Sequence, residues 1–160
     1  INEEAIRGMS KLEHNMKNMK NVLVVILLTM IGQTLSAYAD EQVSKSPAGA
    51  KLYFIEPADK QTVAKTFKVK FGLSGMGVAP SGTNRDNTGH HHLLIDVDTM
   101  PDMTRPLPAS DNIRHFGGGQ TETELTLSPG EHSLQLLLGN FAHIPHSQPV
   151  LSEKITIMVK

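Results

Sequence analysis

Hydrophobic and polar residues alternate most regularly over residues 66–73. Phe67, Val69 and Phe71 occupy every second position, and lysine or glycine fills the positions between and after them. Because successive side chains of a β-strand point to opposite faces of the sheet, this period of two predicts a strand with one buried and one solvated face.

Six further segments carry strand patterns, and stretches rich in glycine and proline separate them. The seven predicted strands cover residues 51–55, 66–73, 90–97, 113–116, 121–127, 132–138 and 154–159. The chain after residue 40 contains no segment with the period of an amphipathic helix. The fold predicted for residues 51–160 is therefore all-β, an immunoglobulin-like antiparallel β-sandwich of about seven strands.

Residues 1–39 have a different pattern, that of an upstream leader followed by a secretory signal peptide. Residues 16–21 supply a basic n-region, residues 22–35 supply an apolar h-region, and small residues end the segment at Ala39. The apolar run is too short and too interrupted for a good transmembrane helix. We therefore expect cleavage after Ala39, export to the periplasm or beyond, and no stable membrane span in the product. Residues 40–50 are polar and are predicted to be a linker.

The composition narrows the class of protein further. The chain has 160 residues, a formal net charge of −1 and no cysteine. This charge gives no electrostatic reason to expect a nucleic-acid partner. Without cysteine the domain has neither a disulfide nor a lipidated cysteine as an anchor, so its stability must come from its hydrophobic core.

Signatures of catalysis are missing from the sequence. It has no cysteine nucleophile and no Gly-x-Ser-x-Gly elbow, and the glycines at 117–119 lack the strand–helix context of a phosphate-binding loop. Asp96 beside a histidine could supply a base and its orienting carboxylate, but no serine is placed convincingly to complete a triad. The sequence therefore predicts a protein that is not an enzyme.

Three consecutive histidines begin the predicted strand 90–97. Strand alternation places His90 and His92 on one face and His91 on the other, together with the apolar residues that favour the core. Two imidazoles at positions i and i+2 lie roughly 6–7 Å apart along a strand, so they can share one metal ion. The spacing predicts that His90 and His92 point together, away from the main core.

In an antiparallel sandwich of this topology, three of the loops emerge at one end of the molecule. Six of the eight histidines fall at that predicted pole, and they come from three separate segments. The predicted metal ligands are His90, His92, His115, His143 and His146, with His91 and Met76 as further candidates. Neutral imidazole suits copper and zinc, and a thioether suits copper(I). One hypothesis is thus a non-enzymatic protein that binds a copper or zinc ion.

A second hypothesis comes from another class. The same histidines could form a structural network that pins the long loops by donating to backbone carbonyls, since buried polar groups are normally hydrogen-bonded. The domain would then be an envelope interaction module that binds a protein or glycan partner. His132 lies at the opposite end of the predicted sandwich, where a corner tyrosine often sits, and is predicted to be structural.

Two blocks of sequence carry a family resemblance. They are Gly-His-His-His-Leu-Leu-Ile-Asp at residues 89–96 and His-Phe-Gly-Gly-Gly-Gln-Thr-Glu at residues 115–122. With the segments around them, over residues 51–159, they resemble an exported bacterial domain-of-unknown-function family, DUF4399. The resemblance implies a small exported domain and brings no activity with it. The fold pattern is also distantly similar to periplasmic copper carriers, but these usually begin with a histidine where this chain has Asp40.

Overall fold

The computed structural model describes residues 2–3, 7–9, 11–12, 15–20 and 43–160. The chain divides into two compact units, Ile1–Glu41 and Gln42–Lys160. Short helical stretches make up the described part of the first unit, and none of the described helices is long and apolar enough to cross a bilayer. The predicted h-region and cleavage site lie outside the described residues.

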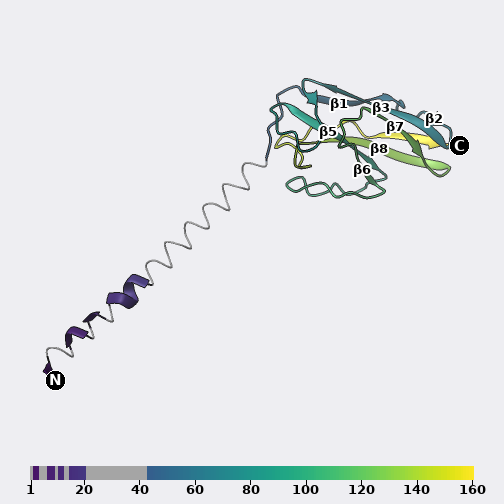
Figure 1. Cartoon of the computed structure of the whole chain (residues 1–160). Helices are drawn as coiled ribbons and strands as arrows, with labels where there is room; N and C mark the ends of the chain where they lie inside the picture. Colours follow the sequence, from purple (N-terminus) through teal and green to yellow (C-terminus); the bar gives the residue numbers. More distant parts are fainter. Residues whose placement is uncertain (1, 4–6, 10, 13–14, 21–42) are drawn as a thin grey trace. The chain divides into compact units, whose positions relative to one another are not determined.

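The second unit consists of β-strands joined by loops (Figure 1). The strands are β1 (Lys51–Glu56), β2 (Thr62–Val63), β3 (Thr66–Ser74), β4 (Gly77–Val78), β5 (Thr88–Ile95), β6 (Ile113–His115), β7 (Glu122–Thr126), β8 (Gly130–Gly139) and β9 (Ile155–Val159). All seven predicted strand segments are present. The short strands β2 and β4 are additional to the prediction.

The strands form two sheets. The smaller sheet has the order β1-β3-β7, and the larger has the order β2-β9-β8-β5-β4, with β6 also paired to β5. All pairs are antiparallel except β2 with β9 and β4 with β5. The order of β1, β3 and β7 in one sheet and β9, β8 and β5 in the other is that of an immunoglobulin-like β-sandwich. The predicted fold class is confirmed.

The main hydrophobic core lies between the two sheets. The alternating residues of β3 supply Phe67, Val69 and Phe71 to it, as their spacing predicts. From the larger sheet, Leu93 and Leu136 are fully excluded from solvent. Burial of a leucine or phenylalanine side chain contributes about 1.5–3 kcal/mol, so this core accounts for the stability of a domain without disulfides.

A second, smaller core covers the outer face of the larger sheet. Its buried members are Leu94, Leu107, Ile113 and Leu137. Leu94 and Leu137 come from the central strands β5 and β8, and Leu107 comes from the long loop before β6. Strand β5 is therefore buried on both faces, and its outer face can hold polar groups away from solvent.

Residues 43–50, predicted to be a linker, contact the loop after β8. The Ser147 N–H donates to the Ser44 carbonyl at 2.9 Å, and the Ser46 hydroxyl donates to the Gln148 carbonyl at 2.6 Å. Ala50 packs against the main core. This segment is thus attached to the sandwich along its length.

Candidate metal centre

His90 and His92 lie on the outer face of the larger sheet. The register of β5 sets His90 opposite Gly139 of β8, and His92 opposite both Leu137 of β8 and His115 of β6. The imidazoles of His90 and His92 are 0% and 1% exposed, and their ring centroids are 4.9 Å apart. Strand alternation thus brings two buried imidazoles together, as the spacing predicts.

Two glycines make room for these rings. A Cβ atom added at Gly139 would lie 2.6 Å from Cε1 of His92, and one added at Gly117 would collide with the imidazole of His115. Real Cβ contacts are essentially never this short. Any other residue at Gly139 would have to displace the imidazole of His92, and any other residue at Gly117 would have to displace that of His115.

His115 and His143 complete a group of four imidazoles, called the histidine cluster below. His115 is exposed at the end of β6, and His143 is partly buried in the loop after β8. The ring centroid of His143 lies 4.6 Å from that of His115 and 5.0 Å from that of His90, but 6.3 Å from that of His92. The two rings therefore stand toward the solvent side of the buried pair.

The loop that carries His143 is held in a defined conformation. The Oδ1 atom of Asn140 accepts hydrogen bonds from the backbone N–H groups of Ala142 and Ile144, at 2.9 and 3.0 Å. His143 itself has a φ of 65°, which is uncommon for a residue other than glycine. Its carbonyl accepts the N–H of Leu107, from the other long loop, at 2.9 Å. Backbone hydrogen bonds thus position the His143 side chain before any ligand binds.

The buried imidazoles lack hydrogen-bond partners. Within the described part of the chain, no hydrogen bond of good geometry reaches either ring nitrogen of His90 or His92, and the one opposing influence on the pKa of His92 is the backbone of His90. One ligand nitrogen from each of His90, His92 and His115 lies within 4.8 Å of the others. Among the described residues no carboxylate belongs to this group, so all of its donors are imidazoles.

Burial makes these imidazoles hard to protonate. It is the largest cause of the low pKa of His90, which falls from the ordinary 6.5 to about 4 with help from His115 and His143. Burial and the neighbouring histidines lower the pKa of His92 to about 3. The pKa of exposed His115 is also lowered, by burial first and then by His143. Neutral imidazole is the form that binds a metal ion.

The other predicted ligands lie elsewhere. The Nε2 atom of His146 is 3.2 Å from the Thr88 carbonyl. His91 is buried on the core face of β5, with its ring centroid 5.1 Å from that of Phe71. Met76 packs against the main core. The cluster also occupies the outer face of one sheet, whereas the prediction placed it among the loops at one end of the sandwich.

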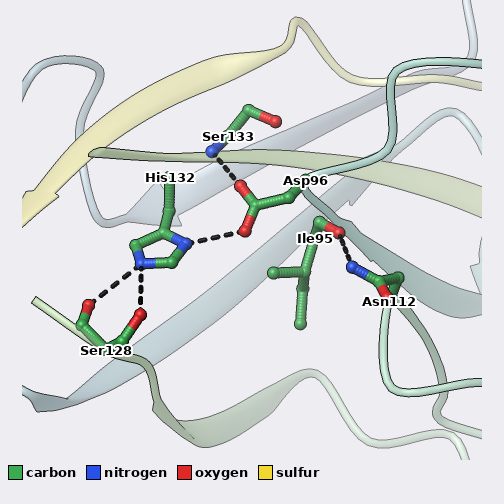
Figure 2. Close-up of polar contacts among 6 residues, drawn as sticks. All are labelled: Ile95, Asp96, Asn112, Ser128, His132 and Ser133. Atoms are coloured by element: carbon green, nitrogen blue, oxygen red, sulfur yellow. Dashed lines mark hydrogen bonds and ion pairs between the residues drawn. The ribbon is translucent and has the colours of Figure 1, made fainter. Parts of the chain in front are cut away.

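His132, predicted to be structural, has partners on both ring nitrogens (Figure 2). Its Nδ1 lies 2.7 Å from Oδ2 of Asp96, and its Nε2 lies 2.9 Å from the Ser128 carbonyl. The other Asp96 oxygen accepts the Ser133 N–H at 2.8 Å. The hydrogen bond with Asp96 is the main cause of the raised pKa of His132. This group is called the His132 clamp below.

The His132 clamp resembles a catalytic triad in its residue types only. The Ser128 hydroxyl lies 3.5 Å from Nε2 of His132, and Asp96 lies on the other side of the ring. However, a carbonyl only accepts, so the contact with the Ser128 carbonyl requires a proton on Nε2. That nitrogen cannot then act as the base for the Ser128 hydroxyl, and the clamp is structural.

The supporting residues Gly139 and Asn140 were not among the predicted site residues. A glycine at the end of a strand and an asparagine after it are typical of a turn, and the sequence offers no sign that both serve histidines. The role of Gly139 becomes visible only from the strand register, which sets it opposite His90.

Comparisons with known proteins give the following relatives. The chain is 27% identical to human WD repeat-containing protein 72 over 136 residues. The aligned region covers 84% of this chain but only 12% of the human protein. The structure of an endo-beta-1,4-mannanase from Thermotoga petrophila aligns with 69% of this chain and 20% of the mannanase chain, with 18% identity and a TM-score of 0.42. The structure of the PKD domain of human KIAA0319 aligns with 74% of this chain and 85% of the PKD chain, with 10% identity and a TM-score of 0.37.

A family model matches residues 69–160, which include the whole histidine cluster. These residues make up more than half of the chain. Its description is "Domain of unknown function (DUF4399)", and the chain belongs to this family.

Proposed function

We propose that this domain is a non-enzymatic protein that binds a copper or zinc ion through His90, His92 and His115. The observation that carries this proposal is that, among the described residues, two buried imidazoles without partners lie together with a third histidine, whereas His91, whose ring nitrogens also lack partners, stands apart on the core face beside Phe71. The ring nitrogens of His90 and His92 are shielded from water and, within the described residues, have no hydrogen-bond partner. An unsatisfied buried polar group costs about 1–3 kcal/mol, and coordination of an ion would give each ring a partner.

This observation weighs against the structural network as an explanation of the cluster. A network that pins loops needs imidazole N–H groups aimed at carbonyl or carboxylate acceptors. The His132 clamp has that form, with a carboxylate on one side and a carbonyl on the other. Among the described residues, neither ring of the buried pair, His90 and His92, makes a hydrogen bond of that form.

The donor set fits copper or zinc. Both ions accept neutral imidazole nitrogens, and metal–nitrogen bonds of about 2.0–2.1 Å require ring nitrogens roughly 3–4 Å apart. The three candidate nitrogens lie within 4.8 Å of one another, close to this range, and His115 is the exposed member of the three.

We also propose that the domain acts outside the cytoplasm. The support is the sequence of residues 16–39, which has the n-, h- and c-regions of a signal peptide. Intact mass of the protein recovered from the periplasm should correspond to a chain that starts at Asp40. Recovery of a product that keeps residues 22–35 would contradict export by cleavage.

Metal analysis of protein purified without a histidine tag tests the binding proposal. We expect copper or zinc at close to one ion per chain, and titration of the metal-free protein with Cu²⁺ and Zn²⁺ should give saturable binding. The absence of binding to either ion would refute the proposal and favour the interaction module.

Two neighbouring substitutions on β6 make a matched pair for that titration. His115→Ala removes an exposed ligand, so the fold should survive, while the affinity should fall by more than the roughly 10–100-fold typical of losing a group that only supports a ligand. Arg114→Ala is the control, because strand alternation turns Arg114 to the opposite face of β6. Equal affinities of the two variants would contradict the assignment of His115.

A further inference from the structure

We propose that the ion bound by His90, His92 and His115 takes a small anion from solvent as an exchangeable fourth ligand, on the side where His143 stands. This inference rests on the proposed function and names what the site binds besides the metal. It concerns the chemistry of small oxygen, nitrogen or halide anions, including carboxylates.

The charge of the proposed site favours an anion. Among the described residues, the group that could hold the ion consists of imidazoles alone. Three neutral ligands leave the full charge of a divalent ion uncompensated.

The burial of two of the ligands also favours an anion. His90 and His92 are almost fully shielded from solvent, so on this side the ion would lie against the protein interior, where the dielectric constant is low. A charge in such surroundings is costly unless it is paired. An anion bound directly to the ion would lower this cost, whereas a water molecule would leave the net charge unchanged unless it lost a proton.

One side of the histidine cluster faces solvent. His115 is exposed and His143 is partly buried, so the side of the cluster that they form is open to small solutes. Three protein ligands with an open position toward solvent are the arrangement in which zinc exchanges its fourth ligand. Gly139 lies against the imidazole of His92 and leaves no space there for another group.

His143 lies where a side chain could hydrogen-bond to the anion. Its ring is near His115 and His90 but 6.3 Å, centroid to centroid, from that of His92, and it is not part of the three-residue ligand group. The Asn140 hydrogen bonds fix the loop that carries it. An imidazole N–H at this position can donate to an anion that the metal holds.

Cobalt(II) and azide provide the test, since Co²⁺ replaces zinc in such sites and its visible absorption reports its ligands. Tag-free full-length protein is loaded with Co²⁺ and then titrated with sodium azide in a buffer that does not coordinate metals. We expect the cobalt bands to shift and saturate with azide. In the His143→Ala variant, Co²⁺ should still bind, and the azide affinity should fall by about tenfold or more, the value of a hydrogen bond to a charged group.

The outcomes separate this inference from the proposed function. If Co²⁺ binds but its spectrum does not respond to azide, the anion site is refuted and the metal site stands. If His143→Ala abolishes Co²⁺ binding while its circular dichroism is unchanged, His143 is itself the fourth ligand, and the inference is wrong. If Co²⁺, Zn²⁺ and Cu²⁺ all fail to bind to the wild-type protein, the proposed function is refuted and the anion site with it.

Discussion

The domain contains two histidine sites with opposite surroundings. In the His132 clamp, a carboxylate and a carbonyl face the ring nitrogens, and the pKa of His132 is raised. In the histidine cluster, the rings of His90 and His92 meet other imidazoles and no acceptor among the described residues, and their pKa values are lowered. Of these two sites, the one whose ring nitrogens already have partners is structural, and the one where, among the described residues, imidazoles without partners gather is the candidate metal centre.

The largest expected effect is that of acid on the metal-free protein. Between pH 6.5 and about 4 the unfolded chain takes up protons at His90, His91 and His92, whereas the folded chain does not, because burial lowers these three pKa values. The stability that these three neutral imidazoles allow is therefore complete above pH 6.5, and it falls as the pH drops, by on the order of a few kcal/mol.

Urea unfolding at a series of pH values, followed by circular dichroism, measures this loss. The decline should begin near pH 6.5. A stability that stays flat down to pH 4 would show that the three imidazoles are not held neutral. Zinc at saturation should move the decline to lower pH, because the ion competes with protons for the same nitrogens.

The next effect is stabilisation by metal at neutral pH. An ion that binds only the folded chain adds about 2.7 kcal/mol at a free concentration of 100 Kd. Zn²⁺ should raise the Tm of the wild-type protein and of His132→Gln, but not that of His115→Ala at the same concentration. An equal rise in all three proteins would mean that the ion binds outside the cluster.

Asp96→Asn tests how much the His132 clamp contributes to the free energy of unfolding. It removes the charge while keeping a residue that tolerates the φ of 53° at this position, and we expect a loss of about 1.5–2.5 kcal/mol. His132 carries a raised pKa, so its contribution is complete below pH 6.5 and is lost as the pH rises through the folded value. The difference between wild type and variant should thus shrink at alkaline pH, as urea unfolding would show.

The smallest effect tests the glycine beneath His92. Gly139→Ala would force the imidazole of His92 out of its rotamer, which costs roughly 0.5–1.5 kcal/mol, so metal affinity should drop by about three- to tenfold. Gly77→Ala is the matched control, because its Cβ would meet the Thr88 methyl at an ordinary 3.5 Å. Titration calorimetry on both variants distinguishes a specific effect on the cluster from a general effect of added methyl groups.

Much of the fold was predictable because the strands alternate. The pattern in β3 and the apolar run after His92 identify the faces that form the main core, and the same alternation places His90 and His92 together. The second core was not predictable, since it depends on loop residues such as Leu107 that have no periodic pattern. The choice between His143 and His146 likewise depends on the conformation of one loop, which spacing does not encode.

The cross-strand alignment of β5 and β6 has a consequence for folding. His115 reaches the cluster only because it stands opposite His92, and a shift of one residue would bring Arg114 there and turn His115 to the other face. A strand of three residues holds its alignment weakly by backbone hydrogen bonds alone. An ion shared by His92 and His115 would bind only the native alignment, so during folding the metal would stabilise the native pairing of β5 and β6 over a pairing shifted by one residue.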